Sequence, residues 1–544
     1  MEQRRNRRLV DGWNFADVWE TIASVAPEEP ALVHGSTRRT WAEFDRRAGG
    51  VASTILTHRL GRQAKVAQYL YNCSEYMESV FAAFKAGLVP VNTNYRYVDG
   101  ELVYLWDNAD VGAVVFHGAF EERIERIRGS LSGVQLWLWV QDSDRSCPSW
   151  AVPYEEAAAA VETVRSVRSG DDLLLLYTGG TTGSPKGVMW RQDDLYNSFS
   201  QNAWRDPTNP DLAAVAARVE ARRRPVGLPA CPLMHGTGLF GAMGQLSQAG
   251  TVVTVPSTRF DVNELLDTVE RERVNVLYIV GDAFAKPIAS AIEAEPERWE
   301  LSSLIAIISS GVMLSEATKT SLLGRSQRLR IIDALSSSEA MGAATSVSSS
   351  GGTAETATFT LGEHTRVIAD DGSDVVPGSG AVGLLAVAGH QPLGYYKDPA
   401  KSAATFRDIG GQRYSVPGDY ATVAADGTLT LLGRGSGCIN TGGEKVFPEE
   451  VEEALKQHTE VRDAAVIGLP DDRFGEVVVA LVELEDGTSI EPRSLIDHVR
   501  ETLAAYKAPR TVLIVESIDR APNGKIPYAR HRERALELPS VTDC

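Results

Sequence analysis

The chain has 544 residues, 43% of them hydrophobic, and a formal net charge of −18. This length exceeds what one hydrophobic core usually organises, which predicts at least two domains. The acidic balance, without a basic stripe, argues against a nucleic-acid partner. No apolar run approaches the ~18 residues of a membrane-spanning helix, so we expect no integral membrane association.

Cysteine usage and the N-terminus indicate a cytoplasmic protein. The five cysteines are odd in number, scattered and without CxxC spacing, which argues against a disulfide framework or a zinc site. The basic residues 1–8 are not followed by the apolar core of a secretory signal. The oligomeric state stays open, with a homodimer as one alternative.

Residues 1–170 alternate between short apolar runs and segments with apolar residues at helical spacing. The runs lie at 66–70, 88–92 and 111–116, and the helical segments at 41–54 and 74–85. Such alternation predicts a parallel sheet covered by helices.

The alternation continues to about residue 310. Further strands are predicted at 173–177, 250–255, 274–280 and 304–309, and a helix at 262–272. The charged amphipathic stretch 213–224 predicts a helix with a solvated face.

The texture changes after Thr345. The Ser/Gly-rich stretch 346–353 predicts a loop, and strands are expected at 382–388 and 428–432, beside turn signals such as Asp371-Gly372. These features indicate a β-rich subdomain at about residues 346–434.

The last hundred or so residues form a unit of their own. Helices are predicted at 448–457 and 495–503, and strands at 463–468, 477–482 and 512–515. The glycine-dense stretch 433–437 suits a hinge. The predicted fold class is therefore α/β. A large N-terminal domain (1–434) of mixed, mostly parallel, helix-flanked sheets carries the β-rich subdomain, and a hinge joins it to a small, mobile α+β domain (435–544).

The segment 177–187, here called the phosphate loop, follows the apolar run 173–177. Its glycines let backbone N–H groups close around an anion, its threonines offer hydroxyls, and Lys186 adds a positive charge. The order Lys186-Gly187 differs from the Gly-Lys-Ser/Thr of a Walker A loop. The alternative is a surface turn, but the combination of these groups favours phosphate binding.

The phosphate loop resembles the signature of the adenylate-forming superfamily, which contains acyl- and aryl-CoA synthetases, firefly luciferase and peptide-synthetase adenylation domains. Segments 31–35, 40–44 and 84–92 resemble further parts of this family in the same order. The resemblance extends over nearly the whole chain. It implies that the protein forms an acyl-adenylate from ATP and a carboxylic acid.

The resemblance also implies which residues bind the nucleotide. In the phosphate loop they are Thr178, Gly179, Gly180, Thr181, Thr182, Gly183 and Lys186. Adenine would meet Ser310, Gly311, Val312 and Asp333, with Ser338 beside Glu339. The ribose hydroxyls would meet Asp419, assisted by Arg434.

The remaining implied roles concern metal, catalysis and the acyl group. Glu339, with Thr178 nearby, would hold Mg²⁺, whose hard-oxygen preference both side chains satisfy. The catalytic residues would be Lys525, bridging the carboxylate and the α-phosphate, and His235 of the gate motif 232–235. The implied acyl pocket contains His235, Gly236, Gly281 and Leu335. Alone, His235 could be a core histidine and Lys525 an exposed turn lysine.

Two glycine-containing segments complete the implied machinery. The hinge would lie at Gly435 and Ser436. Gly442 and Gly443 would line the path of the CoA pantetheine arm after the small domain rotates.

Some positions depart from the general family pattern. Leu335 replaces an aromatic residue beside adenine, and Ser436 and Asn440 replace charged residues. Together with segments 187–191, 281–283 and 394–398, these departures resemble actinobacterial CoA ligases that activate steroid side-chain acids. Gly236, Gly238, Gly241 and Gly281 suggest a wide acyl pocket.

We therefore expect an AMP-forming acyl-CoA ligase that uses ATP, Mg²⁺ and CoA on a bulky or long apolar acid. A steroid side-chain carboxylate is favoured, and a medium- or long-chain fatty acid is the alternative. Transfer to an amine and a non-catalytic nucleotide-binding relative also stay open.

Overall fold

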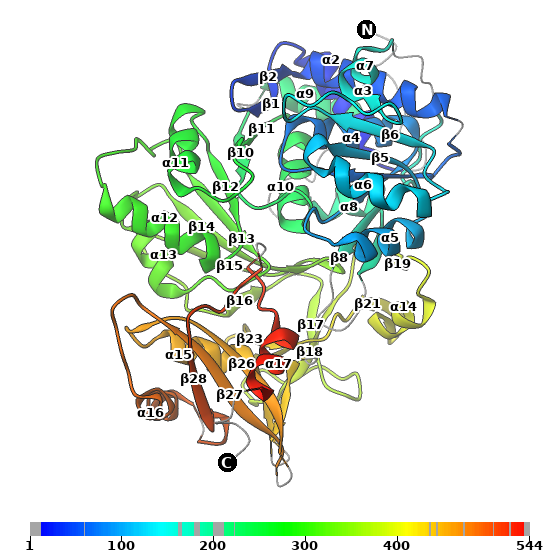
Figure 1. Cartoon of the computed structure of the whole chain (residues 1–544). Coiled ribbons are helices and arrows are strands. Elements are labelled where there is room, and N and C mark those ends of the chain that lie inside the picture. The colour runs from blue at the N-terminus through cyan, green and yellow to red at the C-terminus, as the bar shows by residue number, and fades with distance from the viewer. Residues whose placement is uncertain are drawn as a thin grey trace. The chain divides into compact units, whose positions relative to one another are not determined.

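A computed structural model describes residues 12–58, 60–161, 166–178, 185–199, 211–221, 224–434, 437–441, 444–471, 474–503, 505–521 and 524–537 (Figure 1). Contacts divide the chain into two compact units. Unit 1 comprises the described residues within Met1–Gly179, Ser184–Thr356 and Ala388–Ser415, and unit 2 those within Ala357–Val387 and Val416–Cys544. Each unit has its own hydrophobic core.

The first sheet of unit 1 has eight strands in the order β19-β9-β8-β4-β3-β5-β6-β7. Neighbours from β8 to β7 are parallel, and β9 and β19 add antiparallel pairs at one edge. The strands are β3 (Lys65–Tyr69), β4 (Val89–Asn92), β5 (Val111–His117), β6 (Leu136–Val140), β7 (Val152–Pro153), β8 (Leu173–Thr178), β9 (Lys186–Arg191) and β19 (Gly394–Tyr395).

Helices cover both faces of this sheet. In β8, Leu174 and Leu176 enter one hydrophobic cluster, while Leu175 and Tyr177 enter another on the opposite face. Burial on both faces explains why these strands are continuous apolar runs. The helical elements of this region are α2 (Phe15–Val25), α3 (Trp41–Thr57), α4 (Ser74–Ala86), α5 (Asp99–Asn108), η1 (Gly118–Phe120), α6 (Glu121–Ile127), η2 (Arg128–Ser130), α7 (Tyr154–Ala159), α8 (Gln192–Phe199) and α9 (Leu212–Ala221).

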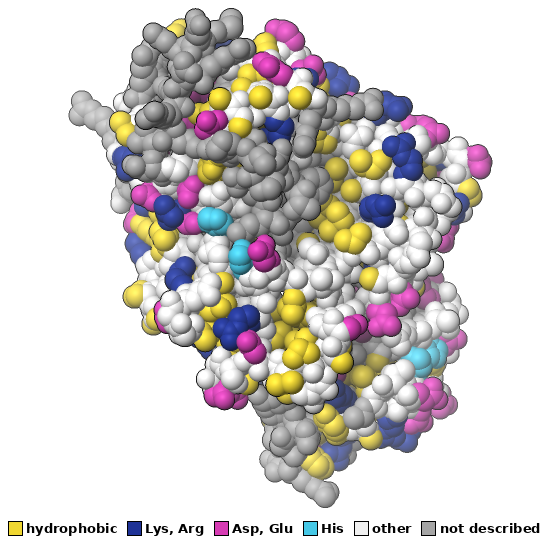
Figure 2. Space-filling model, turned by 180° about the vertical axis from the view of Figure 1, so that it is seen from behind, with side chains coloured by type: hydrophobic (Ala, Val, Ile, Leu, Met, Phe, Trp, Pro, Cys, Tyr) yellow, Lys and Arg dark blue, Asp and Glu magenta, His cyan; other side chains and the backbone are white. Residues whose placement is uncertain are grey.

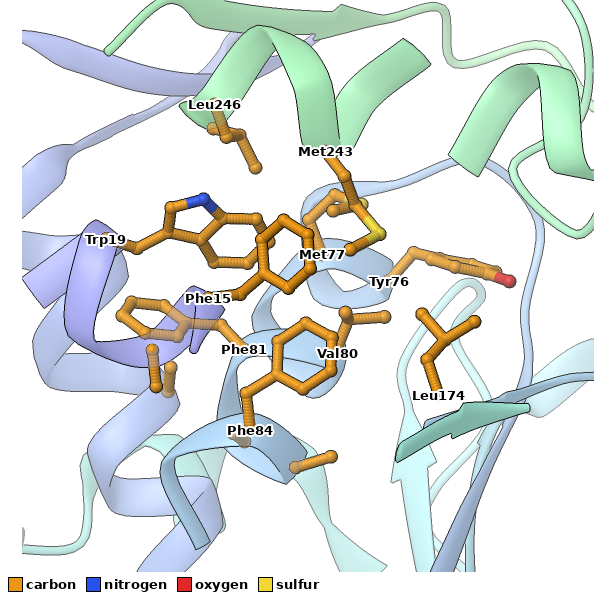
Figure 3. Close-up of a cluster of buried hydrophobic side chains, with 14 of the residues drawn as sticks. Phe15, Trp19, Tyr76, Met77, Val80, Phe81, Phe84, Leu174, Met243 and Leu246 are labelled. Carbon is orange, nitrogen blue, oxygen red and sulfur yellow. The ribbon is translucent and has the colours of Figure 1, made fainter. Parts of the chain in front are cut away.

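Aromatic side chains join the N-terminal helix α2 to the rest of unit 1 (Figure 3). The Phe15 ring stacks on Phe84 of α4 with centroids 5.4 Å apart, and Trp19 meets Phe81 edge-on at 5.3 Å. All four side chains are fully buried. Truncating one such ring to alanine typically costs about 3–5 kcal/mol, so α2 is an integral part of this core.

Within the second sheet, the consecutive strands β2-β1-β11-β10-β12-β13-β14-β15 belong to unit 1, and all neighbouring pairs among them are parallel except β1–β2 and β14–β15. These strands are β1 (Pro30–His34), β2 (Thr37–Thr40), β10 (Val226–Pro229), β11 (Thr251–Thr254), β12 (Val276–Ile279), β13 (Ala306–Ser310), β14 (Arg330–Ser337) and β15 (Ala340–Ser349). The remaining elements of unit 1 are α10 (Gly236–Ser247), α11 (Val262–Arg271), α12 (Asp282–Ala294), α13 (Glu316–Leu323), α14 (Pro399–Thr405), β20 (Phe406–Ile409) and β21 (Gln412–Ser415).

Unit 2 contains an antiparallel sheet and an α+β part. The sheet has the order β16-β23-β22-β18, with β17 paired to β18. Its strands are β16 (Thr358–Leu361), β17 (Thr365–Ile368), β18 (Gly383–Val387), β22 (Asp419–Val423) and β23 (Thr428–Arg434). The α+β part comprises β24 (Ile439–Thr441), β25 (Glu444–Val446), α15 (Pro448–Lys456), β26 (Val461–Asp471), β27 (Gly475–Leu484), α16 (Pro492–Thr502), η5 (Ala505–Lys507), β28 (Thr511–Val515) and α17 (Tyr528–Leu536).

The expected α/β class, with a larger N-terminal and a smaller C-terminal part, is confirmed. The structure corrects the loop expected at 346–353, because β15 continues to Ser349. Ser346 and Ser348 are buried there and pair with Asp333 and Ile331 of β14. The loop was expected because a segment rich in serine and glycine has the composition of a loop, even where its side chains lie in a buried strand.

The distribution of charged and apolar residues in the structure matches two expectations from the sequence. On the face that Figure 2 shows, Lys and Arg side chains are scattered among Asp and Glu side chains. No helix among the described residues has the length and apolarity to cross a membrane.

Candidate active site

Two parallel strands of unit 1, β12 and β13, end beside the middle of a third, β14, in the candidate site. Ile279 of β12 pairs with Ser309 of β13, which pairs with Asp333 of β14. Asp333 is only 4% exposed and Ser309 is fully buried. Carboxyl ends of parallel strands are where open α/β sheets bind ligands, so this edge brings the expected adenine residue Asp333 next to the turn after β13.

The turn after β13 packs tightly against the turn after β12. The Gly281 N–H donates to Ser309 Oγ at 3.0 Å. Gly281 has a φ of +53°, and a Cβ there would lie 2.5 Å from the Met313 carbonyl oxygen and 2.9 Å from that of Val312. The structure therefore brings Gly281 together with the expected adenine residues Ser310, Gly311 and Val312.

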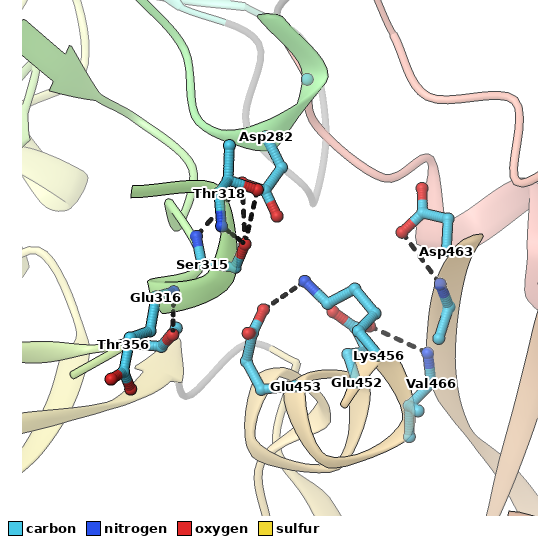
Figure 4. Close-up of polar contacts among 12 residues, drawn as sticks. Asp282, Ser315, Glu316, Thr318, Thr356, Glu452, Glu453, Lys456, Asp463 and Val466 are labelled. Atoms are coloured by element: carbon cyan, nitrogen blue, oxygen red, sulfur yellow. Dashed lines mark hydrogen bonds and ion pairs between the residues drawn. The ribbon is translucent and has the colours of Figure 1, made fainter. Parts of the chain in front are cut away.

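A second contact joins the helices that follow these turns. Asp282 Oδ1 accepts from the Ser315 N–H at 3.1 Å and from the Ser315 hydroxyl at 3.2 Å (Figure 4). Asp282 begins α12, and Ser315 is the N-cap of α13. The two helix starts are thus fixed beside the strand ends.

Neighbouring groups occupy the space beside several glycines. An added Cβ would lie 2.4 Å from the Pro232 carbonyl oxygen at Gly238 and 2.8 Å from the Tyr278 ring at Gly241. At Gly236 it would meet Leu176 at 3.3 Å. The expectation that Gly238, Gly241 and Gly281 leave room for a wide pocket is therefore wrong, because protein atoms fill the space beside them. For Gly236, whose added Cβ meets Leu176 alone, it stays a prediction. The assignment of Gly236 and Gly281 to an acyl site stays a prediction.

Two asparagines, the buried Asn92 and the half-buried Asn72, hold the gate motif 232–235, and the sequence reasoning missed both. Asn92 Nδ2 donates to the carbonyls of Tyr177 (2.8 Å) and Met234 (2.6 Å), and its Oδ1 accepts from the Tyr177 N–H (2.6 Å). Asn72 likewise donates to the Cys231 carbonyl (3.1 Å) and accepts from the Leu233 N–H (2.7 Å). A polar residue at the end of a buried apolar strand is the sequence signal that could have identified Asn92.

The gate histidine begins a helix. His235 is the N-cap residue of α10, and its N–H donates to the Pro232 carbonyl at 3.1 Å. Asn92 therefore links this gate to Tyr177, the residue before Thr178. This clamp couples the expected acyl gate to the start of the phosphate loop.

The expected metal ligand Glu339 lies in the turn between β14 and β15. It is 9% exposed, and its Oε1 accepts from the Tyr395 hydroxyl at 2.7 Å. The Trp190 indole N–H donates to the carbonyl of the adjacent Ser338 at 2.9 Å. Leu335 lies on β14 opposite Ala344. No role was predicted for Tyr395, although segment 394–398 was recognised.

Lys186 begins β9 and pairs with Thr178 across the phosphate loop. Its ammonium forms an ion pair with Asp398, and its side chain is 38% exposed. The hydrogen bond from Lys186 lowers the pKa of Asp398 below its usual range. The two ends of the phosphate loop that the structure describes are thus held by strand pairing.

In unit 2, Asp419 of β22 pairs with Arg434 of β23. Gly433, with a φ of +124°, approaches Glu449 so closely that a Cβ would lie 2.1 Å from Glu449 Oε2. Register thus places the two expected ribose residues on adjacent strands.

The expected catalytic lysine, Lys525, is an exposed residue in a hydrogen-bonded turn of unit 2. The Ala521 N–H donates to the Lys525 carbonyl at 2.9 Å, and Arg520 donates to the Gly524 carbonyl at 2.8 Å. Arg520 also grips both carboxylate oxygens of Asp463, at 2.5 and 2.7 Å. This partly buried pair, also missed from sequence, anchors the turn.

Nine expected site residues lie outside the described residues: Gly179, Gly180, Thr181, Thr182, Gly183, Gly435, Ser436, Gly442 and Gly443.

Comparison with known proteins covers most of the chain. Residues 19–396 match the AMP-binding enzyme family, and residues 450–525 match the AMP-binding enzyme C-terminal domain. The 3-oxocholest-4-en-26-oate--CoA ligase of Rhodococcus rhodochrous is 39% identical over 530 residues, covering 95% of this chain and 94% of that protein. The medium/long-chain-fatty-acid--CoA/3-oxocholest-4-en-26-oate--CoA ligase of Mycobacterium tuberculosis H37Rv is 38% identical over 538 residues, covering 97% of each.

Solved structures share the fold. The anthranilate CoA ligase AuaEII in complex with anthranoyl-AMP superposes with a TM-score of 0.83 at 22% identity, covering 98% of this chain and 99% of that one. The amide bond synthetase McbA from Marinactinospora thermotolerans gives a TM-score of 0.78 at 22% identity, covering 96% and 100%.

Proposed function

We propose that this chain, which belongs to the AMP-binding enzyme family, is an AMP-forming ligase that joins a carboxylic acid to CoA. The observation that carries the proposal is the strand edge at which Asp333 lies beside the tightly packed turns of Gly281 and Gly311. Such an edge suits a flat base held by backbone groups and one carboxylate. The full-length relatives named as CoA ligases support the same activity.

In the first half-reaction, a carboxylate oxygen attacks the α-phosphorus of ATP, and the bond to pyrophosphate breaks. The products are an acyl-adenylate and pyrophosphate. The attack brings anions together, so the site must neutralise charge as the transition state forms. We assign Lys186 to the phosphates and Lys525 to the carboxylate and α-phosphate, because an ammonium supplies a compact point charge.

In the second half-reaction, the CoA thiol attacks the acyl carbonyl and AMP leaves as the thioester forms. Gly442 and Gly443 are proposed to border the pantetheine arm, and Gly435 and Ser436 to form the hinge. We place the domain boundary at residues 434–435. His235 is proposed to line the acyl site with Leu335.

The residues present fit a magnesium ion. Glu339 offers a carboxylate and Thr178 a hydroxyl, both hard oxygen donors, and Mg²⁺ usually takes one or two carboxylates together with substrate phosphates. When bound, the ion would neutralise negative charge on the pyrophosphate leaving group. Glu339 is already oriented by the hydrogen bond from Tyr395.

For the acid, we propose a steroid side-chain carboxylate, with a medium- or long-chain fatty acid as the alternative. The printed names of the two relatives support both choices. Transfer of the acyl group to an amine is a further alternative, since the fold is shared with an amide bond synthetase. We also infer a cytoplasmic enzyme, because the described residues Cys73, Cys147 and Cys231 are free thiols. A homodimer is an alternative to the monomer.

A pyrophosphate-release screen tests the function. Steroid side-chain acids, fatty acids and aryl acids are supplied with MgATP, with and without CoA, and the products are identified by mass. We expect release with the steroid acid and a thioester only when CoA is present. An amide formed with a supplied amine would favour the amide synthetase. No release with any acid would contradict the ligase, and ATP binding without release would favour a non-catalytic relative.

The role of Lys525 has its own test. Lys525→Ala should lower adenylate formation about 10²–10³-fold, the range seen when one charge-stabilising donor is removed. Thioester formation from a supplied acyl-adenylate should persist, since that step does not use the lysine. Because Lys525 is exposed, the variant should fold normally. A wild-type rate of adenylate formation in Lys525→Ala would contradict the catalytic role assigned to Lys525.

A further inference from the structure

The segment 394–398 has no role in the proposed reaction, yet it contacts both charged groups assigned to MgATP. Gly394 and Tyr395 form β19, which pairs with Met189 and Val188 of β9. The Tyr396 N–H continues this pairing by donating to the Gly187 carbonyl at 2.8 Å. The segment is therefore attached to the strand that directly follows the phosphate loop.

The Tyr396 side chain anchors the segment beside the starts of strands β3 and β5. Lys65 Nζ donates to the Tyr396 hydroxyl at 2.9 Å, and this hydroxyl donates to Asp110 Oδ2 at 2.7 Å. Lys397 also contacts Asp110, at 2.7 Å. These bonds tie the segment to the start of β3 and to the residue before β5, so it has a defined position.

Tyr395 reaches Glu339 with its hydroxyl, 2.7 Å from Oε1. Its own position is fixed by the Phe406 ring, with centroids 6.0 Å apart, and by its N–H, which donates to Ser402 Oγ at 2.8 Å. A hydrogen bond to an ionised carboxylate is roughly twice as strong as one between neutral groups. A buried, locked phenol thus determines how the Glu339 carboxylate is turned.

Asp398 divides its two carboxylate oxygens between different partners. Oδ1 accepts from the Lys401 N–H at 2.9 Å and caps α14, while Oδ2 forms the ion pair with Lys186. Both side chains of the pair are partly exposed, at 38% for Lys186 and 29% for Asp398. A partly exposed ion pair is weak enough for a triphosphate to replace it.

We propose that segment 394–398 is a positioning element for MgATP, in which Tyr395 orients Glu339 and Asp398 holds Lys186 until a triphosphate takes its place. The inference rests on the proposed function, because it assumes that Glu339 and Lys186 meet the metal and the phosphates. Tyr395 and Asp398 are positioning residues that act through these two groups.

The Tyr395 half is tested by calorimetric ATP binding to the full chain across a Mg²⁺ titration and with a chelator. Tyr395→Phe keeps the ring and removes the hydroxyl. The Mg²⁺ concentration for half-maximal effect should rise about ten-fold or more, as is common when a partner of a metal ligand is lost. Affinity for metal-free ATP should stay unchanged. In a Glu339→Gln background, Tyr395→Phe should add nothing.

Tyr414→Phe is the matched control, because it removes another buried tyrosine hydroxyl of unit 1, one that donates to Gln412 at 2.9 Å. This variant should leave the Mg²⁺ dependence unchanged. Wild-type Mg²⁺ dependence in Tyr395→Phe, or an equal loss in Tyr414→Phe, would overturn the inference. If the wild-type protein binds no ATP at all, the proposed function fails instead.

The Asp398 half is tested with Asp398→Asn, which keeps a good helix N-cap and removes the charge facing Lys186. Affinity for metal-free ATP should rise roughly two- to five-fold, the range of a partly exposed ion pair. Asp261→Asn, at the N-cap of α11, is the control and should change nothing. Unchanged or weaker ATP binding by Asp398→Asn would show that Asp398 does not hold Lys186 in competition with ATP.

Discussion

Substitution of Gly281 by alanine is the most direct test of the strand edge. Gly281 has φ +53° and ψ −154°, a region that essentially only glycine occupies, and the strain of another residue there is about 1–3 kcal/mol. The new methyl group would also lie 2.5 Å from the Met313 carbonyl oxygen, and overpacking of this kind costs about 1–3 kcal/mol. The loss of unfolding free energy should therefore be about 2–6 kcal/mol, relieved in part by displacing the turn after β13.

That displacement should reach the nucleotide. Because small misplacements in a site have large kinetic effects, we expect kcat/KM for ATP to fall about 10–100-fold in Gly281→Ala, together with the lower denaturation midpoint. Gly244→Ala is the control, since no atom lies within 4 Å of its added Cβ and it sits inside α10. A helical Gly→Ala change should stabilise by about 0.5–1 kcal/mol and leave the kinetics unchanged. Wild-type stability and KM in Gly281→Ala would refute the reasoning.

Asn92→Leu leaves three buried backbone groups without a partner, so the free energy of unfolding should fall by about 3 kcal/mol or more, and KM should rise for both ATP and the acid. Denaturant unfolding and steady-state kinetics measure these changes, and wild-type values for both would contradict the clamp. Arg520→Met removes the partner of the partly exposed Asp463 carboxylate, which should cost about 1–3 kcal/mol and slow adenylate formation; unchanged unfolding would argue against the anchor. Burial raises the pKa of Glu452 to about 8 from 4.5, so folding takes up a proton, and the resulting stability is full below about pH 4.5 and lost as pH rises toward 8. Glu452→Gln should remove this pH slope from the denaturation midpoint, and an unchanged slope would assign it to other groups.

Elements with a strong local pattern could be predicted from the sequence. The strand expected at 173–177 is β8 (Leu173–Thr178), and the helix expected at 448–457 is α15 (Pro448–Lys456). Continuous apolar residues identify the first, and a proline in the first turn with apolar helical spacing identifies the second. The C-terminal end of β15 was not predicted, because Ser346, Ser348 and Ser349 carry no local strand signal. Pairing with β14 holds these serines in the strand.

The partners of the candidate site residues were harder to predict. Glu339, Lys186 and Lys525 stand in recognisable motifs, but Tyr395 and Arg520 act through side chains 56 and 57 positions away. No local pattern reports contacts over such separations. Glycines were misjudged for a related reason, since a missing side chain leaves room only if no neighbouring group fills the space.

The interleaving of the two units along the chain bears on how the protein is synthesised. Strands β16, β17 and β18 leave the ribosome before segment 388–415, which belongs to unit 1, and their partners β22 and β23 follow it. Unit 1 therefore lacks its last segment until Ser415 has emerged, and the antiparallel sheet of unit 2 cannot close until β23 has followed. A nascent chain released before that point carries unpaired strand edges, which are templates for aggregation. Early termination should thus yield insoluble fragments rather than a working unit 1.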